Sequence, residues 1–128
     1  MSKRRYLDID DVLGIHEYQI STTGGASGLR DAGQLASAIH RPQTGYYPDL
    51  IAEAAALWES LSQNHPFVDG NKRTALVSVY VFLGENGLIT TAEDTEVWSF
   101  ILGSLKAGNF TFDRIDAWLR ANTESRTD

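Results

Sequence analysis

Cysteine is absent from this chain of 128 residues, so no disulfide or thiolate metal site can form and no oxidising compartment is implied. Purely apolar runs are only a few residues long, which excludes a membrane-spanning helix. The basic start is followed by Asp8, Asp10 and Asp11, where a signal peptide would have its apolar region. We therefore expect a cytoplasmic protein.

An excess of positive charge is also absent. The formal net charge is −6, whereas broad nucleic-acid binding needs an extended basic face. The basic residues 3–5 are typical of a solvated tail rather than a binding arm. Lys72 and Arg73 concentrate positive charge at one point, where the field suits a nucleotide rather than a duplex. We expect no direct nucleic-acid partner and no membrane partner.

The chain lacks strand-like alternation of apolar residues, internal repeats and low-complexity stretches. Apolar residues instead recur at helical spacing in successive segments. The predicted fold class is all-α: a compact bundle of about six helices with minor or no sheet, in a single domain over residues 1–128. The predicted helices cover residues 8–22, 31–41, 49–64, 71–86, 91–108 and 113–122. Their predicted starts are Asp8, Asp31 with Gln34, Asp49, Asn71, Thr91 with Asp94, and Asp113.

The most informative stretch is residues 65–74, which read HPFVDGNKRT and join two long predicted helices. Phe67 is expected to plug into the core and hold the loop rigid. Gly70 lets the backbone approach a ligand closely, and the first N–H groups of the following helix have no intrahelical partner. Lys72 adds a point charge, and Arg73 adds a planar fork suited to phosphate oxygens. This combination predicts a phosphate site.

His65 and Asp69 extend that prediction. A Mg²⁺ ion between the Asp69 carboxylate and a phosphate would remove their mutual repulsion. Histidine titrates near neutrality, which suits His65 to proton removal from a hydroxyl. The alternative is an ordinary turn before a helix with a structural histidine, although Lys72 and Arg73 in a first helical turn oppose the helix dipole. Both interpretations stay open on residue chemistry alone.

The other histidines are expected to be structural. His16 lies on the apolar face of the first predicted helix, where a half-buried, hydrogen-bonded role is typical. His40 is expected at the surface. Three histidines this far apart show no zinc-ligand spacing.

At residues 65–73 the sequence resembles the Fic/Doc family, whose signature runs His-x-Phe-x-Asp/Glu-Gly/Ala-Asn-x-Arg. The chain reads HPFVDGNKR and matches every specified position. Weaker similarity extends upstream to residues 28–31 and 39–43 and covers most of the chain. The small all-helical size resembles the Doc (death-on-curing) branch rather than the larger Fic enzymes.

The resemblance implies a role for each position, with ATP and Mg²⁺ as cofactors. His65 would be the general base that activates a target hydroxyl, and Asp69 would hold Mg²⁺ on the nucleotide phosphates. The backbone of residues 70–72 would form the anion nest, with the Asn71 amide positioning the phosphates. Arg73 would bind phosphate oxygens and stabilise the charge of the transfer.

Lys72 separates two activities within the resemblance. Adenylylating members generally carry Gly there, whereas Doc-like members share the Lys and are understood to bind ATP reversed, with its γ-phosphate towards the target. The resemblance therefore implies a toxin kinase acting on a Thr or Ser of a translation factor, elongation factor Tu by family analogy, with arrest of translation and growth. Gly70 departs from the Ala of the best-known Doc protein, which keeps protein adenylyltransferase activity open. A non-catalytic nucleotide- or partner-binding module is the third hypothesis.

Two further expectations concern partners. Self-inhibited members carry a Ser/Thr-x-x-x-Glu-Gly/Asn helix, but no Ser or Thr in this chain has a Glu four residues later. The resemblance thus implies restraint by a separate antitoxin, as in type II toxin–antitoxin systems. Tyr46 and Tyr47 lie in a loop before the helix that leads into the motif, where the family places a target-aligning flap. The alternative is that these tyrosines simply cover the core.

Overall fold

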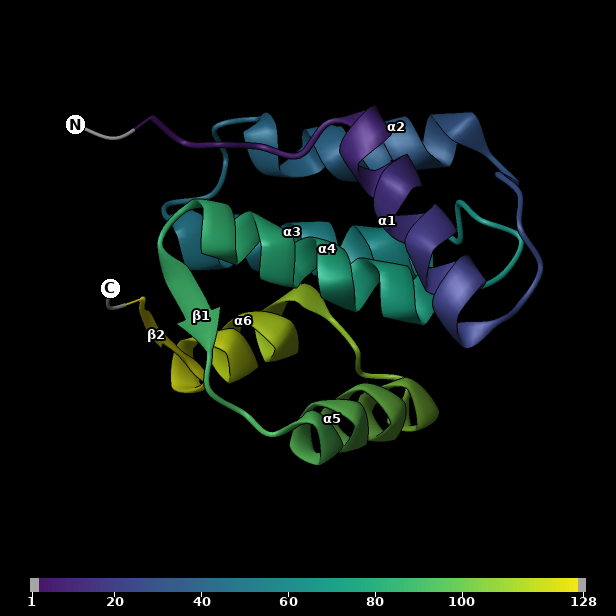
Figure 1. Cartoon of the computed structure of the whole chain (residues 1–128). Helices are drawn as coiled ribbons and strands as arrows, with labels where there is room; N and C mark the ends of the chain where they lie inside the picture. Colours follow the sequence, from purple (N-terminus) through teal and green to yellow (C-terminus); the bar gives the residue numbers. More distant parts are fainter. Residues whose placement is uncertain (1–2, 127–128) are drawn as a thin grey trace.

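The computed structural model describes residues 3–126 of the chain (Figure 1). Six α-helices carry the fold over that range, and the all-α prediction is confirmed. They are α1 (Ile9–Thr23), α2 (Ala32–His40), α3 (Leu50–Gln63), α4 (Asn71–Glu85), α5 (Asp94–Ala107) and α6 (Phe112–Ala121). A 3₁₀ turn, η1 (Arg41–Gln43), follows α2, and the short strands β1 (Leu88–Thr90) and β2 (Thr123–Ser125) pair antiparallel.

Aspartates start the first three helices, as the sequence predicts. Asp8 begins α1 with a reciprocal capping box. Asp31 accepts a hydrogen bond from the Gln34 N–H at 3.0 Å, and Asp49 accepts one from the Ala52 N–H at 3.0 Å. Each bond satisfies a backbone donor that has no partner inside its helix, which is why these three positions set the helix boundaries.

The predicted start of α5 at Thr91 is wrong. This helix begins after Glu93, which forms a capping box with Glu96. The Thr91 N–H instead donates to the Asn122 carbonyl at 2.7 Å, beside the paired strands. Glutamate is not among the preferred N-cap residues, so the pattern favoured the threonine.

α3 forms the centre of the bundle and packs against α2, η1, α4 and α6. The alanines at positions 54–56 are fully buried, which lets the neighbouring helices approach closely. Trp58 is also fully buried, with its ring centroid 5.7 Å from that of Phe110 and 5.8 Å from that of Trp118. Burial of apolar area stabilises the fold by about 25 cal/mol per Å², so this aromatic cluster is a large contributor.

The start and the end of α4 lie on opposite sides of the molecule (Figure 1). A loop of residues 64–70 leads into its start, and Figure 1 shows this loop on the side opposite to both chain termini. At the far end of α4, Asn86 exchanges two hydrogen bonds with the backbone of Arg5, at 2.9 and 2.8 Å. The Arg126 N–H donates to the Gly87 carbonyl there at 2.8 Å. The fold therefore anchors its terminal segments away from the motif.

Candidate active site

Phe67 fixes the loop between α3 and α4, as predicted. Its side chain is only 2% exposed and belongs to the main core. The Asn71 carboxamide holds its backbone, since Oδ1 accepts from the Phe67 N–H and Nδ2 donates to the Phe67 carbonyl, both at 2.9 Å. The Asn71 side chain thus shapes the loop, and it is the backbone N–H of this residue that starts the helix.

The start of α4 is open to an anion. Gly70 precedes it with φ 76° and ψ 18°, a left-handed conformation that glycine adopts without strain. A Cβ at this position would lie 3.2 Å from Ile20 Cδ1, so a side chain would also be crowded. No side chain of the described residues caps this helix, which leaves its first N–H groups for a ligand.

The predicted site residues of the motif meet in one pocket of about 300 Å³. It is lined by His65, Val68, Asp69, Gly70, Asn71, Lys72, Arg73 and Trp98. The structure thereby brings together the predicted base, the predicted metal ligand and the predicted phosphate-binding residues. Trp98 comes from α5, and the sequence analysis did not assign it to the site.

Two predicted residues do not join this pocket. Tyr46 is 82% exposed and packs edge-on against Tyr47, with ring centroids 5.1 Å apart. The Tyr47 hydroxyl accepts from Arg41 Nε at 2.7 Å, and the same guanidinium pairs with Glu59 at 2.8 Å. Burial opposes the charge of Arg41, but the hydrogen bonds to Glu59 and Tyr47 prevail and raise its pKa. These contacts fasten the tyrosine loop to α3, and neither tyrosine lines the motif pocket.

A different loop, residues 24–30, lies along the motif. Leu29 and Phe67 form an isolated antiparallel bridge. The Val68 N–H donates to the Gly28 carbonyl at 3.0 Å, and the Arg30 N–H donates to the Pro66 carbonyl at 2.7 Å. The sequence held a signal for this loop, since it contains a glycine cluster and overlaps the family-like residues 28–31.

Arg30 in this loop braces the predicted base. Its Nε donates to the His65 carbonyl at 2.6 Å, and its Nη2 donates to the Asn64 carbonyl at 2.9 Å. His65 has a φ of 48°, in the left-handed region that non-glycine residues seldom adopt. Two donors on adjacent carbonyls hold this conformation in place, and the His65 side chain remains exposed at the pocket.

Asp69 is oriented by two backbone donors. One carboxylate oxygen accepts from the Gly70 N–H at 2.9 Å and the other from the Ala26 N–H at 3.2 Å. A carboxylate offers about four lone-pair sites, so acceptor capacity remains for a cation. Residues 3–126 contain no cluster of three or more His, Asp or Glu that would hold a metal alone. A single carboxylate still fits Mg²⁺, which typically takes one or two carboxylates together with substrate phosphates.

His16 supports the motif from beneath, and its predicted structural role is confirmed. The ring is 5% exposed and stacks on that of Phe67, with centroids 3.8 Å apart and planes within 6°. Its Nε2 lies 2.8 Å from the Asp69 carbonyl oxygen. Because a carbonyl oxygen only accepts, Nε2 carries the proton and donates in this contact. His40 is exposed, also as expected.

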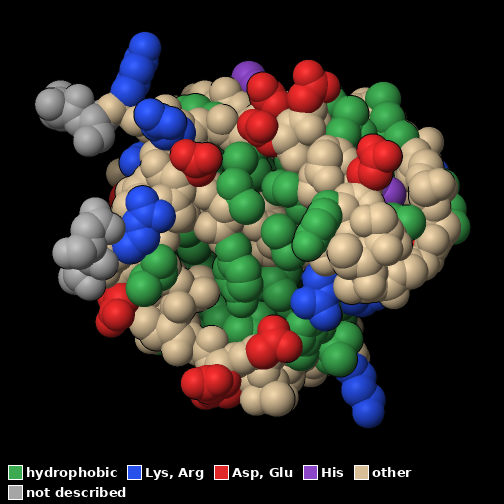
Figure 2. Space-filling model, viewed as in Figure 1, with side chains coloured by type: hydrophobic (Ala, Val, Ile, Leu, Met, Phe, Trp, Pro, Cys, Tyr) green, Lys and Arg blue, Asp and Glu red, His purple; other side chains and the backbone are tan. Residues whose placement is uncertain are grey.

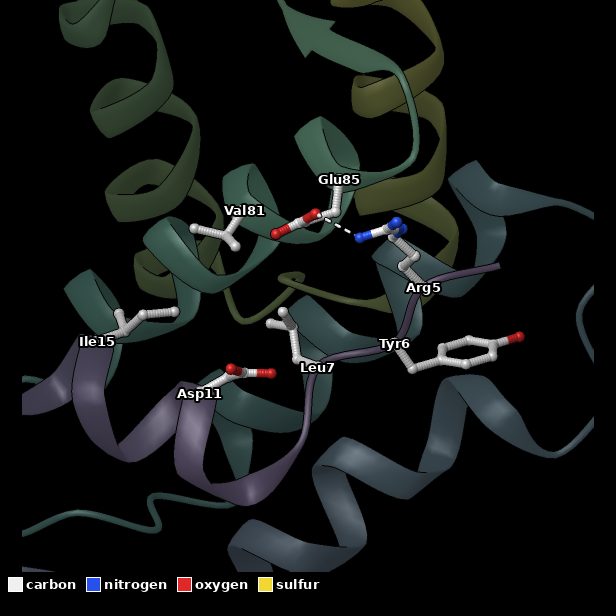
Figure 3. A pocket seen from close by; sticks show the side chains of 7 residues that line it. All are labelled: Arg5, Tyr6, Leu7, Asp11, Ile15, Val81 and Glu85. Carbon is white, nitrogen blue, oxygen red and sulfur yellow. Dashed lines mark ion pairs between the residues drawn. The ribbon is translucent and has the colours of Figure 1, made fainter. Parts of the chain in front are cut away.

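A larger hollow of about 410 Å³ lies elsewhere, between the N-terminal segment, α1 and α4 (Figure 3). Leu7, Ile15 and Val81 form its apolar part, and Arg5 faces Glu85 across its rim at 3.7 Å. Both partners of that ion pair are well exposed, so the pair adds little stability. No residue of the motif lines this hollow.

The described helices also bear on the membrane question. Within residues 3–126, none is both long and apolar enough to cross a bilayer.

The fold and the pocket define a small helical domain with an uncapped helix start, a histidine and an arginine at one site. Residues 6–83 match the model of the Fic/DOC family. The chain belongs to the Fic/Doc family.

Two relatives are similar over most of their length. "Toxin Doc" of Mycolicibacterium smegmatis is 45% identical over 93 residues, which cover 69% of this chain and 69% of the relative. "Protein kinase doc" of Escherichia phage P1 is 33% identical over 88 residues, which cover 66% of this chain and 70% of the relative. Both names come from the Doc branch, in agreement with the resemblance at the motif.

Proposed function

We propose that the chain is a Doc-type toxin, a Mg²⁺·ATP-dependent kinase that phosphorylates a Thr or Ser hydroxyl of a protein target. The observation that carries the proposal is the convergence of His65, Asp69 and Arg73 around the uncapped start of α4. The names of the two relatives, a toxin and a protein kinase, support it. By family analogy the target is elongation factor Tu, and the outcome is arrest of translation and growth in the cytoplasm.

The proposed chemistry divides among the pocket residues. His65 removes the proton of the target hydroxyl while the hydroxyl oxygen attacks the γ-phosphorus. The bond between the γ-phosphorus and the leaving ADP oxygen breaks in the same step. The first N–H groups of α4, with Lys72 and Arg73, hold the phosphate oxygens and offset the charge of the transfer. Mg²⁺ bound at Asp69 would neutralise phosphate charge.

The rival activity at the same pocket is nucleotide transfer. Gly70, which matches the Fic form of the signature, favours it, whereas the side chain of Lys72 occupies the position where adenylylating members carry glycine. ATP labelled on the α- or the γ-phosphate separates the two activities in a cell lysate. We expect γ-label alone on the modified protein, and α-label on protein would refute the kinase proposal.

A non-catalytic binding module is the rival from another class. His65→Ala tests it, because the substitution removes the proposed base and leaves Lys72, Arg73 and the helix start intact. We expect label transfer and growth arrest to be lost while the variant still binds Mg²⁺·ATP in calorimetry. Persistent transfer in this variant would show that His65 is not the base.

An antitoxin is the proposed partner. Figure 2 shows hydrophobic side chains gathered along the middle of one face, over α4 and towards α5. Among the residues of α4 and β1, Tyr80, Val81 and Leu88 are partly buried and pack against the core. Exposed apolar surface of this kind marks interaction sites. We expect the chain expressed alone to arrest growth, with relief by its cognate antitoxin; harmless expression of soluble, folded protein would contradict the proposal.

A further inference from the structure

Trp98 contacts the predicted phosphate-binding arginine. Its ring centroid lies 4.6 Å from Cζ of Arg73, within the range of a cation–π interaction. Trp98 is also the one lining residue of the motif pocket, among the described residues, that lies outside the segment 65–73. A residue of α5 thus reaches the start of α4 at the point where the positive charge is concentrated.

The contact leaves the charge of Arg73 available. None of the ion pairs within residues 3–126 includes this arginine. A carboxylate partner would compete with a phosphate for the guanidinium, whereas an aromatic face uses none of its five N–H donors. An arginine held against a ring also loses less rotamer entropy when it binds a ligand than a freely moving one.

The indole is held by packing rather than by a hydrogen bond. Its Nε1 is buried without a hydrogen-bond partner among the described residues. Replacement of Trp98 by Phe therefore removes no hydrogen bond and keeps an aromatic face, while replacement by Leu removes that face. Trp98→Phe should therefore weaken the interaction with Arg73, and Trp98→Leu should remove it.

We propose that Trp98 is a positioning residue for Arg73: its ring holds the guanidinium at the pocket wall, ready for the phosphates of Mg²⁺·ATP. The inference rests on the proposed function for the identity of the ligand. Because Arg73 is also proposed to offset the charge of the transfer, the inference predicts weaker affinity and a higher KM together with a lower kcat.

The test measures the Kd of Mg²⁺·ATP by calorimetry, and KM and kcat by transfer of γ-label, in Trp98→Phe and Trp98→Leu. Cation–π energies correspond to changes of roughly 2- to 30-fold in Kd. We expect about fivefold weaker binding for Trp98→Leu and a smaller loss of affinity for Trp98→Phe. Trp118→Leu is the matched control, because Trp118 is also partly buried but stacks on Phe100, away from the pocket. Its Kd should equal that of the wild type.

A double-mutant cycle separates positioning from general destabilisation. In an Arg73→Ala background, Trp98→Leu should have no further effect on Kd. An equal loss in both backgrounds, or tighter binding by Trp98→Leu, would overturn the inference. Wild-type protein that binds Mg²⁺·ATP with this mutational pattern but transfers no label would refute the kinase proposal alone. Wild-type protein that binds no Mg²⁺·ATP would overturn both.

Discussion

At the scale of single residues, the site depends on glycines that keep space beside charged groups. Gly25 is the clearest case, since a Cβ there would lie 2.9 Å from the Asp69 carboxylate oxygen Oδ2. Its φ is also +109°, which a side chain would strain. The neighbouring Gly24 has a φ of +87° but nothing within 4 Å of its Cβ position. A substitution at Gly24 would therefore cause backbone strain alone, whereas one at Gly25 would cause both strain and contact with Asp69.

We predict that Gly25→Ala weakens Mg²⁺·ATP binding more than Gly24→Ala does. Both variants should lose stability of roughly 1–3 kcal/mol, the usual cost of an unfavourable backbone region. Only the first displaces the carboxylate proposed to hold Mg²⁺. Calorimetry at several Mg²⁺ concentrations measures the difference, and equal affinities in the two folded variants would count against the role of Asp69.

At the scale of elements, a bidentate ion pair between Asp49 and Arg120 joins the start of α3 to α6. The Asp49 carboxylate accepts from Arg120 Nη1 at 3.0 Å and from Nη2 at 2.9 Å. These bonds to Arg120, followed by the N–H of Ala52, lower the pKa of Asp49. A lowered pKa in the folded state adds stability above the ordinary carboxyl pKa, and this stability is lost as the pH falls through the folded value.

Asp49→Asn keeps the helix cap but removes the charge, so its cost should depend on pH. Because the pair is exposed, we expect a loss of about 0.5–1 kcal/mol in the free energy of unfolding at pH 7. The difference from the wild type should begin to shrink below about pH 4, where the carboxyl of the unfolded chain becomes protonated, and should vanish only below the lowered pKa of the folded state. Urea unfolding at pH 7 and pH 3 measures it, and a difference independent of pH would contradict this assignment.

The elements also show what could be predicted from the sequence. Asp8, Asp31 and Asp49 marked helix starts because a cap is a local interaction between residues three positions apart. Thr91 was misassigned because its partner, Asn122, is distant in the sequence. Local chemistry was sufficient for the starts of α1, α2 and α3, and insufficient for the start of α5 and for the strand pair beside it.

The candidate site shows the same contrast between local interactions, which the sequence predicts, and contacts between distant residues, which it does not. His65, Asp69 and residues 70–73 were predicted to form one site, and they line one pocket, because they are close together in one loop and one helical turn. Trp98 and Arg30 reach the site only through tertiary packing, which residue spacing does not encode. The order of the chain could not show how the tyrosine loop is anchored: Arg41 binds Tyr47 and Glu59 of α3, and neither tyrosine lines the pocket.

At the scale of the whole molecule, binding at one pocket should stabilise the entire cooperative domain. Mg²⁺·ATP at 100 times its Kd should add about 2.7 kcal/mol to the free energy of unfolding, or several degrees in Tm. His65→Ala should retain this shift, because the base is not proposed to bind phosphate, whereas Arg73→Ala should lose most of it. Differential scanning calorimetry measures both, and an unchanged shift in Arg73→Ala would exclude it from phosphate binding.

The anchoring of both terminal segments at Asn86 and Gly87 has a practical consequence for engineering the protein. Arg5 and Arg126 bond to these consecutive residues, and a 15-residue helix, about 22 Å long, separates them from the pocket. A fluorescent or affinity module attached at Arg5 or Arg126 would therefore lie far from the motif pocket.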